Sequence, residues 1–136
     1  MEQLIIENDI KVFGIEVKTF PAGIDDAFLE LLRKTGDPAG ARNYYGVSSM
    51  NKDGKMIYKA VAEQKFNDEA EKLNFEKSTI EKGAYLYATL KNWRTQTNCI
   101  KDIFHEMMND DHTDKTKPCV EWYKNDEEML CLVKAI

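Results

Sequence analysis

A carboxylate flanked by aromatic residues near the C-terminus is the sequence feature best suited to chemistry. The segment 119–123 reads Cys-Val-Glu-Trp-Tyr. Successive side chains of a β-strand point to opposite faces, so Val120 and Trp122 share one face and Cys119, Glu121 and Tyr123 share the other. Glu121 is therefore the leading candidate for a ligand-binding or catalytic group.

A second aromatic segment precedes it in the chain. Over residues 83–90 the aliphatic side chains fall on one parity and Tyr85 and Tyr87 on the other. We expect these tyrosines, with Trp93, to line the same groove as Glu121, on the face of the sheet that helices leave uncovered. A carboxylate surrounded by rings suits a hydrophobic or cationic organic ligand.

The same residues also have structural interpretations. A lone glutamate on a strand is often only solvated. Tyr85 and Tyr87 could be cross-strand packing partners, and Trp93 could cover a core or an edge of the sheet. The pattern alone leaves these alternatives open.

Other constellations of polar residues do not indicate a site. The acidic run 109–114 lacks the central glycine and terminal glutamate of a calcium loop. Cys99 and His105 are six residues apart on one predicted helix, so they point about 240° away from each other. Neither a serine elbow nor a glycine-rich phosphate loop occurs. We therefore expect no metal and no cofactor.

The first half of the chain contains the elements of an α+β unit. Residues 10–20 alternate as a strand does, and apolar residues recur at helical spacing from Ile24 until Gly36 offers a stop. Residues 43–50 and 55–64 flank an Asn-Lys-Asp-Gly turn, which predicts a hairpin.

The second half repeats this order. Residues 75–90 are strand-like with a bend at Gly83, 95–109 predict an amphipathic helix, and 118–124 and 129–136 predict a second hairpin. We predict one domain over 1–136, with pseudo-repeats of about 1–64 and 73–136. The two strand-helix-strand-strand units would join into one antiparallel sheet, with both helices on one face and a ligand groove on the other.

Length and composition restrict the classes of protein that fit. The chain has 136 residues, 43% of them hydrophobic and 32% charged, as in a globular protein. A net charge of −5 disfavours direct nucleic-acid binding. Three widely spaced cysteines indicate reduced thiols, and no stretch has the length of a membrane span or the pattern of a secretory signal. We therefore expect a cytoplasmic protein without a membrane partner.

The segment 117–123 and its surroundings resemble the GyrI-like small-molecule-binding domains, a family that includes the effector-binding domains of AraC-type and MerR-type multidrug regulators. The specific part is Pro118-Cys119-x-Glu121-x-Tyr123. The duplicated unit and the stretch 80–85 are similar but more generic. The resemblance implies a groove between the two units in which Glu121 meets the charge of a ligand and Tyr123 is the adjacent aromatic.

The resemblance leaves three functions open. The first is a stand-alone binding protein for a hydrophobic or cationic effector, related to transcription-regulator domains. The second is a hydrolase of strained electrophilic natural products, in which Glu121 acts on water or on a developing cation. The third is a gyrase-inhibitor-like interaction module with a protein partner or a second copy of the chain. The chain lacks the helix-turn-helix of the multidrug regulators, since both predicted helices cover the sheet. We favour the first function.

Overall fold

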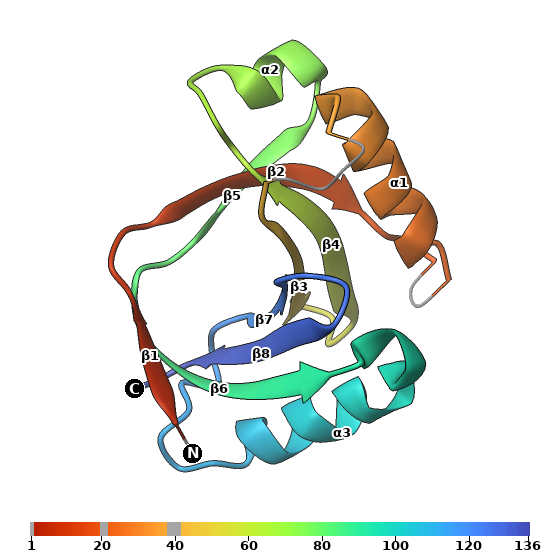
Figure 1. Ribbon diagram of the computed structural model, residues 1–136. Helices are drawn as coiled ribbons and strands as arrows, with labels where there is room; N and C mark the ends of the chain where they lie inside the picture. Colours follow the sequence, from red (N-terminus) through yellow and green to blue (C-terminus); the bar gives the residue numbers. More distant parts are fainter. Residues whose placement is uncertain (1, 20–21, 38–41) are drawn as a thin grey trace.

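A computed structural model describes residues 2–19, 22–37 and 42–136. One antiparallel sheet of eight strands, in the order β1-β6-β8-β7-β3-β4-β2-β5, forms the centre of the fold (Figure 1). The predicted α+β fold is confirmed. The strands are β1 (Gln3–Ile6), β2 (Ile10–Glu16), β3 (Tyr44–Met50), β4 (Met56–Glu63), β5 (Glu76–Ile80), β6 (Gly83–Lys91), β7 (Cys119–Tyr123) and β8 (Glu128–Lys134).

Two longer helices pack on the same face of this sheet. They are α1 (Ile24–Thr35), which contacts β4, and α3 (Thr97–Met108), which contacts β8. The sheet curls, so the helices lie on its convex face and the other face is concave (Figure 1). In this view α1 and α3 lie on either side of β3 and β7, the strands at the middle of the sheet.

Three groups of buried apolar residues hold these layers together. The first joins α1 to β2 and β4 around Phe13, Leu31 and Tyr58. The second joins α3 to β6 and β8 around Met107 and Met129. The third fills the concave face, where it contains side chains such as Val12, Tyr45, Val61, Val120 and Leu132. Both faces of the sheet are therefore buried over much of their area.

The helix bounds follow from local sequence signals. Gly23 and Gly36, which flank α1, both have the positive φ that glycine adopts without strain, 89° and 68°. Asp25 and Asp26 lie in the first turn and Arg33 in the last, where each complements the helix dipole. The predicted helix is therefore confirmed, since α1 begins directly after Gly23 and ends directly before Gly36.

Three elements were not predicted, and one prediction was too long. β1 and the short helix α2 (Glu69–Leu73) lie in segments that the sequence pattern left without structure. The first predicted strand ends at Glu16 rather than Phe20, and Phe20 lies outside the described residues. A 3₁₀ turn, η1 (Trp93–Thr95), precedes α3.

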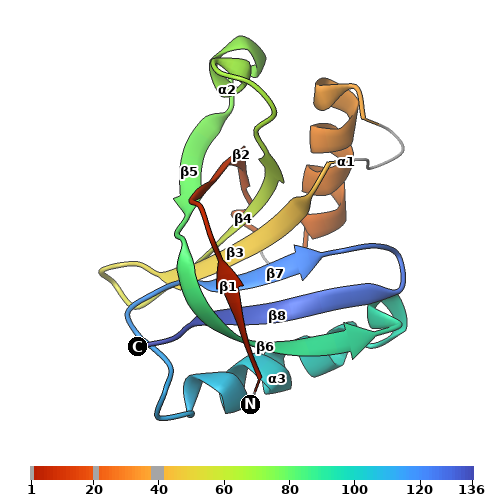
Figure 2. The same ribbon diagram turned by 60° about the vertical axis from the view of Figure 1, so that its left-hand side comes forward.

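Two short strands, β1 and β5, each pair with a strand from the other half of the chain. β1 pairs with β6 of the second half, whereas β5 pairs with β2 of the first half. Figure 2 shows β5 running on into β6. The predicted bend occurs at Gly83, whose φ of 131° is open to glycine but strained for other residues. β1 and β5 are the two edge strands of the sheet, and they extend its curvature around the concave face.

A buried ion pair attaches α2 to the start of β3. The Arg42 guanidinium donates to both carboxylate oxygens of Glu69 at 2.9 Å, and both side chains are about 5% exposed. Glu69 also accepts from the backbone N–H of Lys65 at 2.9 Å. Two-pronged pairing of this kind satisfies a buried carboxylate that would otherwise be costly.

No helix among the described residues is both long and apolar enough to cross a bilayer.

Candidate functional site

Glu121 lies at the centre of β7, the strand between β3 and β8. Its partners in register are Gly46 on β3 and Cys131 on β8. The neighbouring residues Val120 and Trp122 contribute to the concave core, whereas Cys119 and Tyr123 pack with the α3 group. Glu121 therefore projects from the helix-bearing face, between the areas covered by α1 and α3.

Two tyrosine hydroxyls hold the Glu121 carboxylate. Tyr123 donates to Oε1 of Glu121 at 2.5 Å, and Tyr58 donates to the same oxygen at 2.7 Å. The two hydroxyl oxygens are 3.1 Å apart. Because Tyr58 lies on β4, its side chain reaches Glu121 across the whole width of β3.

Gly46 makes this contact sterically feasible. A Cβ atom at this position would lie 2.1 Å from the Tyr58 hydroxyl and 2.5 Å from Oε1 of Glu121. Both distances are far below van der Waals contact. Glycine inside a strand often marks the close approach of another group, and here the groups are a phenol and a carboxylate from the two flanking strands.

Burial dominates the electrostatics of this cluster. It raises the pKa of Glu121, and the hydrogen bonds from Tyr123 and Tyr58 offset part of that increase. Burial and the nearby carboxylate also raise the pKa values of both phenols. Both tyrosines therefore remain protonated near neutral pH and act as hydrogen-bond donors.

The carboxylate has no cationic partner in the part of the chain that the structure describes. No nitrogen of a lysine, arginine or histidine in those residues lies within 4.0 Å of its oxygens. Two thiols share its face instead, and burial with the charge of Glu121 raises the pKa of Cys119 to about 11 and that of Cys131 to about 12. A cation brought to this position would meet a carboxylate without a competing protein charge.

Aromatic side chains from both halves of the molecule surround Tyr123. Phe28 of α1 meets the Tyr123 ring edge-on, with centroids 5.2 Å apart, and also contacts Tyr44 at 6.5 Å. Trp93 also contacts Tyr123, with ring centroids 5.0 Å apart. Its indole nitrogen donates to the backbone oxygen of Asn125 at 2.9 Å, which fixes the ring. The rings thus form a bridge from α1 to η1 next to the carboxylate.

The predicted site residues divide between the two faces of the sheet. Glu121, Tyr123 and Trp93 come together, as expected. Tyr85 and Tyr87 belong to the concave core, so they do not share a groove with Glu121. The prediction that Glu121 points to the face opposite the helices was wrong, because Val120 and Trp122, not Glu121, occupy that face. A ligand-binding role for any of these five residues stays a prediction.

Sequence reasoning missed four members of the cluster: Gly46, Tyr58, Phe28 and Tyr44. The glycine was the available signal, since it interrupts an otherwise β-prone run at 43–50. Tyr58 gave no comparable signal, because its contact with Glu121 spans 63 residues of sequence and depends on the order of the strands.

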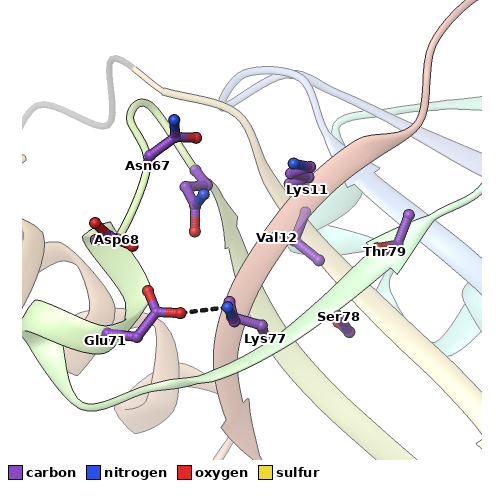
Figure 3. A pocket seen from close by; sticks show the side chains of 9 residues that line it. Lys11, Val12, Asn67, Asp68, Glu71, Lys77, Ser78 and Thr79 are labelled. Atoms are coloured by element: carbon purple, nitrogen blue, oxygen red, sulfur yellow. Dashed lines mark ion pairs between the residues drawn. The ribbon is translucent and has the colours of Figure 1, made fainter.

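Two cavities lie away from Glu121. The larger, about 500 Å³, is bordered by β2, β5 and the segment 64–71, and Figure 3 shows Lys77 directed toward Glu71 within it. The smaller, about 200 Å³, lies on the concave face. Glu121 lines neither cavity. Among the described residues, no group of three or more histidine, cysteine or acidic side chains is arranged to hold a metal ion.

Comparison with known proteins supports the fold only. No family model matches the chain, and no curated protein sequence matches it. Among solved structures, the protein SAV2435 bound to tetraphenylphosphonium has a TM-score of 0.70 at 14% identity, over 100% of this chain and 94% of that one.

Two further structures are similar to a comparable degree. An integron cassette protein from the mobile metagenome of Vibrio cholerae has a TM-score of 0.68 at 14% identity, over 99% of this chain and 95% of that one. A Staphylococcus aureus MU50 protein assigned provisionally to bacterial transcription regulation has a TM-score of 0.62 at 14% identity, over 98% and 97%. At these identities the likeness establishes a shared fold.

Proposed function

We propose that this chain is a GyrI-like small-molecule-binding protein that takes a hydrophobic organic cation at Glu121. The observation that carries the proposal is a carboxylate with a raised pKa, held by two phenols and beside a bridge of rings, with no cation in ion-pair distance among the described residues. The tetraphenylphosphonium bound to the structural neighbour SAV2435 supports a ligand of this class.

The energies divide between charge and ring contact. A cation about 4 Å from the carboxylate gains roughly 4 kcal/mol at an effective dielectric of about 20, before desolvation is subtracted. Micromolar affinity requires about 8 kcal/mol. The remainder would come from buried apolar area and from cation–π contacts of roughly 0.5–2 kcal/mol each with rings such as Tyr123 and Trp93. Glu121 would thus select the charge, and the rings would supply most of the affinity.

The hydrogen bonds of Glu121 also fit such a role. Two phenol donors orient Oε1 of the carboxylate and satisfy it without neutralising its charge. A lysine or arginine at the same position would cancel that charge and compete with the ligand. The resemblance to effector-binding domains implies that ligand binding serves as a signal, and we propose that this chain acts in the cytoplasm as such an effector-binding module.

Isothermal titration calorimetry with tetraphenylphosphonium tests the proposal. Wild type should bind saturably, and Glu121→Gln should weaken binding at least tenfold, which corresponds to about 1.4 kcal/mol. Glu106→Gln is the matched control, because it removes the same charge from an exposed position on α3 and should leave binding unchanged. Equal affinities in wild type and Glu121→Gln would refute the assignment.

A further inference from the structure

The smaller cavity lies on the opposite side of β7 from Glu121. Val120, the neighbour of Glu121 in sequence, forms part of its wall, and the alternation of the strand directs the two side chains to opposite faces. The cavity is therefore separate from the proposed cation site. The lining residues that matter for its chemistry are Val47, Ile80, Tyr85, Val120, Lys117 and Lys134.

The walls of this cavity combine an apolar surface with lysine side chains. Val47, Ile80, Val120 and the Tyr85 ring all belong to the concave core. The ammonium nitrogen of Lys134 lies over the Tyr85 ring, 5.9 Å from its centroid. The cavity thus offers an apolar wall beside a positive charge, whereas the site at Glu121 offers a negative charge.

Local structure places Lys134 against the cavity. Gly83 has no side chain, and a Cβ there would lie 2.9 Å from both the Cε and Nζ atoms of Lys134. The Tyr85 hydroxyl donates to the backbone oxygen of Glu81 at 2.5 Å, which fixes the ring beneath the ammonium group. Gly83 therefore has a second role besides the bend, because it provides room for the lysine.

The acids near the cavity have other hydrogen-bond or ion-pair partners, and none of the described acids forms an ion pair with Lys134, although the charge of Asp114 acts on it from a longer distance. Glu81 forms an ion pair with Lys117, in which Oε1 of the carboxylate is 2.9 Å from the lysine Nζ atom. Asp114 accepts from the hydroxyl and the backbone N–H of Thr116 at 2.6 and 3.0 Å. Asp9, whose charge reaches Tyr85, accepts from the backbone N–H of Lys82 at 2.8 Å.

Within the described residues, no carboxylate oxygen lies within 4.0 Å of the Lys134 nitrogen. Two lysines and one glutamate line the cavity, so its charge is positive in a chain whose net charge is −5. An anion is the ligand charge that this arrangement favours.

We propose that this cavity binds a small monocarboxylate with a short apolar tail. The carboxylate would meet Lys134, with Lys117 close by, and the tail would lie against Val47 and Val120. A volume of about 200 Å³ equals the share of roughly seven water molecules, at about 30 Å³ each. A chain of five or six carbons is therefore the size that fits.

An NMR titration of the ¹⁵N-labelled full chain with hexanoate tests this proposal. The amide signals of Val47, Glu81, Val120 and Lys134 should shift and saturate. Hexan-1-ol has a similar tail without the charge and should bind at least fivefold more weakly. Saturation with equal affinities for the acid and the alcohol would overturn the role of the lysine, and shifts that never saturate would overturn the site.

Two variants separate the lysine from general charge effects. Lys134→Gln should weaken hexanoate binding at least fivefold, whereas Lys101→Gln, an exposed change on α3, should not alter it. The dispersed amide spectrum reports whether each variant folds. Val120→Leu provides a second test, because the larger side chain fills part of the cavity and should weaken hexanoate binding while leaving the charge intact. Unchanged hexanoate affinity in both Lys134→Gln and Val120→Leu would refute the proposal. Binding of tetraphenylphosphonium should be the same in Lys134→Gln as in wild type, so this site can fail independently of the cation site.

Discussion

The contact of Tyr58 with Glu121 across β3 predicts that alanine at position 46 destabilises the protein. Gly46 is not among the residues with positive φ, so its backbone suits alanine, and such a change inside a strand ordinarily stabilises by about 0.5–1 kcal/mol. Here the new Cβ would lie 2.1 Å from the Tyr58 hydroxyl and 2.5 Å from the Glu121 carboxylate. The expected sign is therefore opposite to the ordinary one.

The magnitude follows from the contact that must break. Losing the hydrogen bond from Tyr58 to Glu121 costs about 1–3 kcal/mol, and forcing a methyl group into a packed core costs about 1–3 kcal/mol more. After the gain from removing a glycine is subtracted, we expect a net loss of about 3 kcal/mol in the free energy of unfolding. For a chain of this length that loss lowers Tm by roughly 12 °C.

Urea unfolding of Gly46→Ala, Tyr58→Phe and the double variant provides the assay. Tyr58→Phe removes the hydroxyl that the new Cβ would meet first, so Gly46→Ala should cost at least about 1 kcal/mol less in that background. The single variant Tyr58→Phe controls for the lost hydrogen bond. A stabilising effect of Gly46→Ala, or an equal loss in both backgrounds, would refute the proposed crossing over β3.

Three further predictions concern buried groups. Glu69→Gln removes the charge that pairs with buried Arg42 at 2.9 Å and leaves Arg42 with Asp37, whose carboxylate is 4.0 Å from Nε, so it should cost about 3 kcal/mol in urea unfolding at pH 7. Burial raises the pKa of Glu69, but the hydrogen bonds from Arg42 and Lys65 lower it by more, so the net pKa is lowered. This stabilisation should therefore be present above the unfolded pKa of Glu69 and decline as pH falls through its folded pKa, and a pH-independent loss would contradict it. Burial raises the pKa of Glu121 in the folded state, so its contribution to stability is present below the unfolded pKa and is lost as pH rises through the folded pKa. Wild type should therefore lose more stability between pH 4 and pH 8 than Glu121→Gln. Parallel stability curves for the two proteins would count against burial of this group. The thiols of Cys119 and Cys131 should react with iodoacetamide at pH 8 far more slowly in the folded protein than in urea, as mass spectrometry of digests would show, and equal rates would contradict their raised pKa values.

Sequence periodicity was sufficient to predict most of the fold. Alternation and glycine signals identified α1, α3 and both hairpins, because those elements depend on local backbone preferences and on turns that adjacent residues form. β1 could not be predicted in the same way, since its four residues become a strand only by pairing with β6, some 80 residues away. Local patterns carry no information about such a partner.

The candidate site was predicted in part for a related reason. Parity correctly separated Glu121 and Tyr123 from Val120 and Trp122, but it did not determine which of the two faces the helices cover. Assigning Glu121 to the same face as Tyr85 and Tyr87 therefore failed. The position of Tyr58 beside Glu121 required the strand order β7-β3-β4, which no local pattern specifies.

The ionisation of Glu121 tests the central claim most directly. Carboxyl ¹³C NMR of glutamate-labelled protein, with Glu121→Gln to assign the signal, would measure its pKa with and without tetraphenylphosphonium. We expect a pKa above the ordinary glutamate value in the free protein and a lower pKa when the cation is bound, since a nearby positive charge favours the carboxylate. An ordinary pKa that the cation leaves unchanged would contradict the proposal that this carboxylate is the ligand's counter-ion.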